Sequence, residues 1–197
     1  MAEVTIRLNR LGLERGRMWQ AVLAAIAIAL PMALWLGLER ALGDSVQNIG
    51  EGDTLFLQSY PVAGASLEYE LPGSGWTSPG IHFADQRQNF VRDYLSASVE
   101  VDSGVDSLER LLDRRAEPVT AQRGLVYNNV RPYANEDAGL AGFRADLIGV
   151  DSIGSITVVG NDKGAAAILV LIAPGADPAA EEVDPDPYIA TFALEGK

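Results

Sequence analysis

The stretch MWQAVLAAIAIALPMALWLGL, from Met18 to Leu38, constrains this 197-residue chain more than any other feature. It holds 21 residues, and Gln20 is the only polar side chain among them. A helix rises about 1.5 Å per residue, so this one would extend for roughly 30 Å, the thickness of the hydrocarbon core of a bilayer. A secretory signal has a shorter apolar region of roughly 7–15 residues before its cleavage site, although residues 41–43 resemble such a site. The length therefore favours a single transmembrane helix over a cleaved signal.

Charges on either side of this segment predict its orientation. Four arginines precede it, against two acids, whereas one arginine is soon outnumbered by three acids after it. Short cationic flanks stay in the cytoplasm. We therefore expect a single-pass protein of the plasma membrane, in contact with membrane lipid. Its predicted parts are a cytoplasmic tail (1–17), a transmembrane helix (18–38), a linker (39–53) and an extracytoplasmic domain (54–197).

Composition narrows the classes of function. Beyond residue 40 there are 10 Lys or Arg and 24 Asp or Glu, a balance that argues against nucleic acid as a partner. The chain has no cysteine, which excludes disulfides, thiolate nucleophiles, iron–sulfur clusters and covalently attached haem. His82 is the single histidine, whereas a zinc or copper site normally uses several His or Cys side chains. We expect no cofactor and no metal centre.

Hydrolytic chemistry would have to depend on His82. Ser78 and Asp85 lie near it in the sequence, but no G-x-S-x-G motif accompanies them. A histidine in a stretch such as GIHFAD is more often a packed or surface residue than a catalytic base. The sequence therefore predicts no catalytic residue, and we do not expect an enzyme.

Five acids gather between residues 177 and 186, where calcium is an alternative to a plain acidic loop. They are Asp177, Glu181, Glu182, Asp184 and Asp186. Calcium prefers oxygen ligands, but the spacing matches no EF-hand loop and the neighbouring prolines restrict convergence of the side chains. A plain acidic loop is the favoured interpretation.

Alternating and apolar patterns predict a strand-rich outer domain. Strands are expected at 54–58, 66–71, 94–101, 124–133 and 141–150. A hairpin is expected from 156–160 and 165–174, joined by the turn NDKG. Its second strand is apolar on both faces, which is typical of the middle of a covered sheet. Trp76, in a turn-rich loop, is expected to pack into the core.

Helical spacing predicts an amphipathic helix at 105–115. Its apolar stripe is Val105, Leu108, Leu111 and Leu112. Ser103 and Asp106 resemble a helix start, and Pro118 lies just beyond the expected end. A short terminal helix is expected at 186–194, with Asp186 as its N-cap and Pro187 in its first turn.

Two sets of residues are candidates for contact with a partner. Ala21, Ala25 and Ala29 lie four apart in the apolar segment, and small residues let membrane helices approach closely. The alternative is that alanine is merely common in such helices. Arg110, Arg114 and Arg115 are expected on the side of helix 105–115 opposite its apolar stripe. They form either a docking site for an acidic partner or headgroup, or simply a solvated face.

The order of the expected elements resembles the PsbP-like and LpqN-like domains, which actinobacteria often tether outside the membrane. The stretches that carry the resemblance are LEYELPGSGW (67–76), VDSLERLLDRR (105–115) and YIATFAL (188–194). The resemblance implies an α+β fold, in which an α/β/α sandwich with a mainly antiparallel sheet follows the transmembrane helix. Members of this group are mostly binding or assembly modules.

Two kinds of single-pass protein are similar in layout, and each implies a partner. One comprises accessory subunits of the actinobacterial cytochrome bcc–aa3 respiratory supercomplex, and the other comprises TtfA-like partners of a lipid flippase. We therefore expect a non-catalytic accessory or assembly subunit of an integral membrane complex. Cytochrome subunits are the first choice of partner and a lipid flippase is the second. A lipid- or small-ligand-binding module is the alternative class, and an exported enzyme ranks last.

Overall fold

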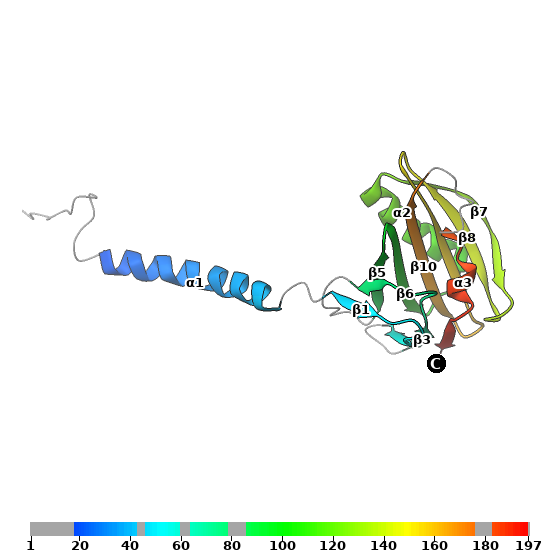
Figure 1. Ribbon diagram of the computed structural model, residues 1–197, viewed down its shortest axis with the longest axis horizontal. Helices are drawn as coiled ribbons and strands as arrows, with labels where there is room; N and C mark the ends of the chain where they lie inside the picture. The colour runs from blue at the N-terminus through cyan, green and yellow to red at the C-terminus, as the bar shows by residue number, and fades with distance from the viewer. Residues whose placement is uncertain (1–17, 43–45, 60–63, 79–85, 176–182, 197) are drawn as a thin grey trace, which may run out of the picture. The chain divides into compact units, whose positions relative to one another are not determined.

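The computed structural model describes residues 18–42, 46–59, 64–78, 86–175 and 183–196 (Figure 1). The chain divides into two compact units, Met1–Ser45 and Val46–Lys197. The predicted cytoplasmic tail, His82, Asp85 and the acids of 177–182 lie outside the described residues. Each unit is considered by itself.

The first unit contains one helix, α1 (Met18–Leu42), with Pro31 inside it. Its apolar side chains are exposed, from 41% for Val22 to 72% for Ile28. A helix is therefore present where one was predicted, and it continues four residues beyond Leu38, but its predicted transmembrane character is not supported. Across the described ranges, no helix is both long enough and apolar enough to cross a membrane.

The second unit is built on an eight-stranded sheet with the order β1-β4-β5-β6-β10-β9-β8-β7, in which every described pairing is antiparallel. Its strands are β1 (Gln47–Ile49), β4 (Trp76–Ser78), β5 (Arg87–Arg92), β6 (Leu95–Ser103), β7 (Val126–Asn135), β8 (Leu140–Ile148), β9 (Ser152–Gly160) and β10 (Ala165–Pro174).

A second, three-stranded sheet has the order β11-β3-β2. It consists of β2 (Leu55–Gln58), β3 (Ala65–Tyr69) and β11 (Ala193–Gly196). Two helices complete this unit, α2 (Leu108–Arg123) and α3 (Asp186–Ile189). Thr191 links the two ends of the domain, because its hydroxyl donates to the Glu70 carbonyl at 2.9 Å and accepts from the Glu70 N–H at 3.1 Å.

The large sheet separates two apolar clusters. On one face, Leu111, Leu112 and Ala116 of α2 pack with side chains such as Ile156 and Val158 of β9. On the other face, the small sheet and α3 pack over side chains of β6 and β10, in a larger cluster. The α+β class and the mainly antiparallel sheet are therefore confirmed. The layering differs from the predicted α/β/α sandwich, because three strands and a four-residue helix form the second outer layer.

The predicted central hairpin is confirmed. β9 and β10 pair from Gly160 opposite Ala166 to Ser152 opposite Pro174. β10 lies between β6 and β9, and its residues are buried from Ala165 to Ala173, as its two-faced apolar sequence predicts. Trp76 is also buried as expected. Its indole N–H donates to the Pro72 carbonyl at 3.0 Å, and the Arg92 guanidinium lies 4.6 Å from its ring.

The predicted boundaries of α2 are wrong at both ends. Ser103 ends β6, and the N-cap is Ser107, whose hydroxyl accepts from the Arg110 N–H at 3.3 Å. Pro118 lies inside the helix, which continues to Arg123 and ends at Gly124 with φ 63°. The helix continues because Ala116 and Val119 extend its apolar face over the sheet. That packing offsets the hydrogen bond that proline cannot donate.

Two further boundaries depend on pairing between distant residues. β1 lies within the predicted linker 39–53, because Gln47–Ile49 pairs with β4. The terminal helix predicted at 186–194 ends at Ile189, since residues 193–196 pair with β3 instead. Pro185, rather than Asp186, occupies the N-cap position and makes no side-chain cap. β5 was not predicted.

Replacing Ser107 by Ala should destabilise the domain by about 1 kcal/mol, because the first turn of α2 loses the hydroxyl that accepts from a backbone N–H. Ser103→Ala is the matched control, and it should have a much smaller effect. Urea unfolding of the full chain measures both. An equal or larger loss for Ser103→Ala would contradict the position of this cap.

Replacing Leu111 by Ala should lower the free energy of unfolding by about 2–5 kcal/mol, because this side chain is buried between α2 and the sheet. Val150→Ala removes an exposed side chain and should stay within about 0.5 kcal/mol of the parent. The same unfolding measurement compares the two variants. Similar stabilities would mean that the face of α2 bearing Leu111 is not packed.

Candidate functional site: a groove beside helix α2

A groove runs along one side of α2 because this helix covers only part of the sheet. α2 packs on β8 and β9 and, less extensively, on β7. On the same face, β6 presents Ser96, Ser98 and Glu100, whereas Leu95, Ala97, Val99 and Val101 are buried on the other face. The alternation of β6 thus places polar side chains where no helix covers the sheet.

The groove contains a cavity of about 180 Å³ and a neighbouring cavity of about 70 Å³. Arg87, Ser98 and Val119 are among the residues that line both cavities, so the two are adjacent. The walls come from β5 and from the second half of α2, and the floor includes Val170 of β10. The site therefore joins an apolar floor to polar walls.

One arginine of the groove is held by acids. Arg115 lies 2.5 Å from Glu100 and 3.1 Å from Asp102, measured between guanidinium nitrogen and carboxylate oxygen. Burial raises the pKa of the Glu100 carboxyl above its ordinary value, against the charges of Arg115 and Arg87, which lower it. The Arg115 Nε is buried and has no hydrogen-bond partner. Arg115 thus fixes the acidic end of the groove.

The other two arginines reach into the groove from opposite walls. Arg87 of β5 donates from Nε to the Ser98 hydroxyl at 2.9 Å. Arg123, in the last turn of α2, donates from Nη1 to the Ser96 hydroxyl at 3.1 Å. Among the ion pairs between described residues, none includes Arg87 or Arg123. Two exposed guanidinium groups therefore retain donors beside the same cavity.

The residues predicted to contact a partner differ in their exposure and in the element that carries them. Arg110 and Arg114 are exposed on α2, whereas Arg115 turns toward β6, so its predicted position on the solvated side is wrong. Ala21, Ala25 and Ala29 all lie in α1, where the last two are exposed. Ser78 is buried in β4 and donates to the Asn89 carbonyl at 3.2 Å.

Arg87 and Arg123 were not predicted as site residues. Arg87 begins β5, a strand that was itself not predicted, and Arg123 lies beyond the expected end of the helix. The alternation of β6 could have indicated part of the groove. One face of this strand is apolar, and the other carries Ser96, Ser98 and Glu100.

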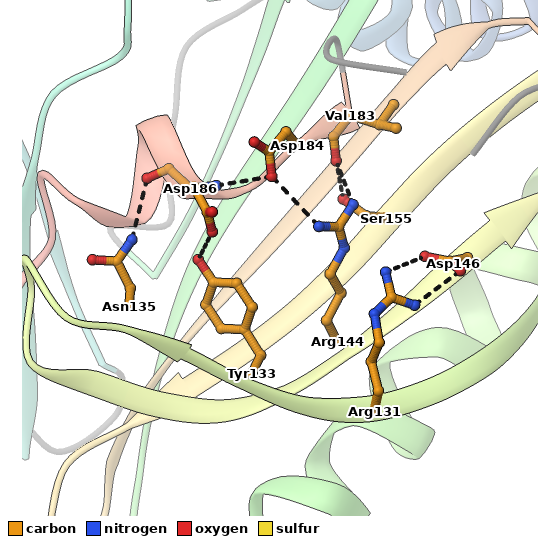
Figure 2. Close-up of polar contacts among 9 residues, drawn as sticks. All are labelled: Arg131, Tyr133, Asn135, Arg144, Asp146, Ser155, Val183, Asp184 and Asp186. Carbon is orange, nitrogen blue, oxygen red and sulfur yellow. Dashed lines mark hydrogen bonds and ion pairs between the residues drawn. The ribbon is translucent and has the colours of Figure 1, made fainter. Parts of the chain in front are cut away.

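A second polar constellation lies on the opposite face of the large sheet, near β7 and β8 (Figure 2). Asp146 is buried and accepts two hydrogen bonds of 2.9 Å from Arg131, in bidentate geometry. Asn129, in a β-bulge with φ 54°, donates to the same carboxylate at 2.6 Å. Burial opposes the charge of Asp146, but these hydrogen bonds, with the charges of Arg131 and Arg144, lower the pKa of its carboxyl.

The same face holds the segment that precedes α3. The Val183 carbonyl accepts from the Ser155 hydroxyl at 2.6 Å and from Arg144 at 3.3 Å, and Arg144 also lies 3.4 Å from Asp184. Tyr133 donates to the Asp186 carboxylate at 2.6 Å. Figure 2 shows these side chains directed from the strands toward the segment. This cluster holds the segment against the sheet through contacts within the protein, although the buried Nε of Arg144 has no hydrogen-bond partner.

Among the residues that the structure describes, no group of three or more His, Cys, Asp or Glu side chains is arranged to hold a metal ion. Asp184 and Asp186, the described members of the acidic run, are hydrogen-bonded to the protein as above.

Asp146→Asn should destabilise the full chain by about 1–3 kcal/mol at pH 7, because it removes the charged acceptor of Arg131. The stabilisation belongs to the ionised carboxyl, whose folded pKa lies below the ordinary value of 3.8. It is fully present above that value and is lost as the pH falls through the lower, folded value. The difference between parent and variant should therefore shrink below about pH 4.

Urea unfolding at several pH values measures this difference. Glu117→Gln, at an exposed carboxylate of α2, is the control, and it should show little difference from the parent at pH 7. A gap for Asp146→Asn that stays constant from pH 7 to pH 3 would contradict the assignment.

Comparison with family models finds no match, and comparison with curated protein sequences finds none either. Among solved structures, the chain is similar to the Ran-binding protein Mog1p of Saccharomyces cerevisiae, with 12% identity and a TM-score of 0.40 over 63% of this chain and 78% of that one. A protein from Bacteroides thetaiotaomicron matches with 17% identity and a TM-score of 0.32, over 73% of this chain and 48% of that one. Both similarities are too distant to carry an argument about this chain.

Proposed function

We propose that the chain is a non-catalytic accessory or assembly subunit of a membrane protein complex, held there by α1. The observation that carries this proposal is the distribution of apolar side chains around that helix. Successive residues turn by about 100°, so Val22, Leu23 and Ile28 point to three different sides. They are 41%, 48% and 72% exposed. A helix that is apolar on all sides requires an apolar environment on all sides.

The arginines that precede α1 in the sequence support an orientation with residues 1–17 in the cytoplasm and the sheet domain outside. The small residues Ala21, Ala25 and Ala29 supply one side of α1 that allows close approach of another helix. Together with the resemblance to tethered actinobacterial domains, these features favour cytochrome subunits of the respiratory supercomplex as the partner. A lipid flippase is the alternative partner.

The proposal is tested by tagging the full chain, extracting membranes in mild detergent and identifying the proteins that co-purify. Recovery of cytochrome subunits in stoichiometric amounts is the expected result, and recovery of a lipid flippase would favour the alternative. Replacing Ala25 and Ala29 by Leu should reduce recovery of the partner, because larger side chains keep helices apart. Ala27→Leu is the matched control, because Ala27 lies on the side of α1 opposite Ala25 and Ala29.

Two results would contradict this function. One is a tagged chain found in the soluble fraction after cell lysis, because α1 would then have no membrane environment. The other is a membrane-bound chain that purifies alone under every mild condition. Equal recovery with the double variant and with Ala27→Leu would instead reject only the alanine contact, and would leave membrane association intact.

A second candidate function, a small-ligand-binding module, is favoured by the groove beside α2. Its cavity of about 180 Å³ is lined by both apolar and polar side chains, and Arg87 and Arg123 stand at it without ion-pair partners among the described residues. Ligand sites commonly combine an apolar lining with a few placed polar groups. The two candidate functions are compatible, since they use different parts of the chain.

A further inference from the structure

We propose that the groove beside α2 binds a small organic monocarboxylate, whose carboxylate lies between Arg87 and Arg123 and whose apolar part lies on β10. This inference rests on the second candidate function, ligand binding by the sheet domain, and it specifies the chemistry of the ligand. It requires neither the membrane association nor the partner complex of the first candidate function, the accessory subunit.

The position of the carboxylate follows from the two serines that hold the arginines. Ser96 and Ser98 lie on the same face of β6, about 7 Å apart along the strand. Each hydroxyl accepts from one guanidinium, Arg123 in one case and Arg87 in the other, so both groups are oriented toward the floor between the walls. A guanidinium has five N–H donors, and one hydrogen bond to serine leaves others for an oxyanion.

The apolar part of the ligand is indicated by the floor of the same cavity. Val170 and Ile172 of β10 line it and are 8% and 7% exposed, whereas Ile168 and Leu169 are almost completely buried. Val119 of α2 closes the side. A cavity of about 150 Å³ can hold a molecule the size of benzene, so the 180 Å³ here suits a chain or ring of roughly six carbons.

The acidic end of the groove favours one negative charge over two. Glu100 lines the smaller cavity, next to Ser98 and Arg87. Its ion pair with Arg115 leaves a carboxylate close to the bound anion, which would repel a second negative charge. Phosphate groups carry about −1.5 to −2 near neutral pH, whereas a carboxylate carries one charge. The groove therefore favours a carboxylate over a phosphate monoester.

The test is a calorimetric titration of the folded full chain, in a neutral detergent, with hexanoate as the probe. Hexanol has the same carbon chain without the charge, and inorganic phosphate has charge without the chain. We expect hexanoate to bind with one site per chain, and both comparators to bind at least tenfold more weakly. Arg87→Gln and Arg123→Gln should each lower the affinity for hexanoate roughly 10- to 100-fold, the usual effect of losing a charged hydrogen bond.

Arg110→Gln is the matched control, because it removes an exposed arginine of α2 that does not line the groove. Its hexanoate affinity should equal that of the parent. Val119→Phe fills the cavity without changing charge and should also abolish binding. Unfolding curves of all variants establish that each is folded at the titration temperature, and only folded variants are compared.

The outcomes separate this inference from the function on which it rests. Equal binding of hexanol and hexanoate, sensitive to Val119→Phe, would retain a ligand-binding groove and overturn the carboxylate site. Tighter binding of phosphate than of hexanoate would overturn it as well, as would equal loss of affinity in Arg110→Gln and Arg123→Gln. Absence of binding by all three probes at millimolar concentration would overturn both the inference and the second candidate function.

Discussion

The burial of β10 on both faces is the constraint on which the rest of the sheet domain depends. This strand hydrogen-bonds to β6 on one side and β9 on the other, and its side chains alternate between the two apolar clusters. Because both faces are apolar, each needs its own cover. α2 supplies the cover on one face, and the small sheet with α3 supplies it on the other. The three-layer arrangement is thus a consequence of one strand.

Unequal cover of the two faces explains where polar side chains collect. The small sheet and α3 are fastened over their face, where Arg131 and Arg144 are paired with Asp146 and Asp184. A single helix crosses the other face, and beside it the strand pattern becomes polar on that side. Arg87 and Arg123 meet the groove in this uncovered region, with serines as their partners. The ion pairs of one face hold the fold together, whereas on the other face Arg115 is paired with acids and Arg87 and Arg123 have only serine partners.

Strands with a strong pattern could be predicted from the sequence, whereas features that depend on distant pairing could not. β3, β6 and the β9–β10 hairpin follow from alternation or continuous apolarity. β5 was missed because Gln88 and Arg92, which share the core side of the strand with the buried Phe90, are polar, so RQNFVR lacks a clean alternation. The sequence predicts a helix through Leu194, but residues 193–196 form a strand because they pair with β3. The meeting of Arg87 and Arg123 at one cavity was unpredictable for the same reason, since it depends on how α2 packs beside β5 and β6.

The pairing of β11 with β3 has a consequence for the time at which the domain can fold. Leu194 lies opposite Leu67, and Thr191 bonds Glu70, so contacts that close the second layer span more than 120 positions of the chain. Loop-closure entropy makes such contacts slow to form. During synthesis, β3 emerges long before β11 and has one edge unpaired until residues 193–196 are made. The core can therefore be completed only after residues 193–196 have left the ribosome.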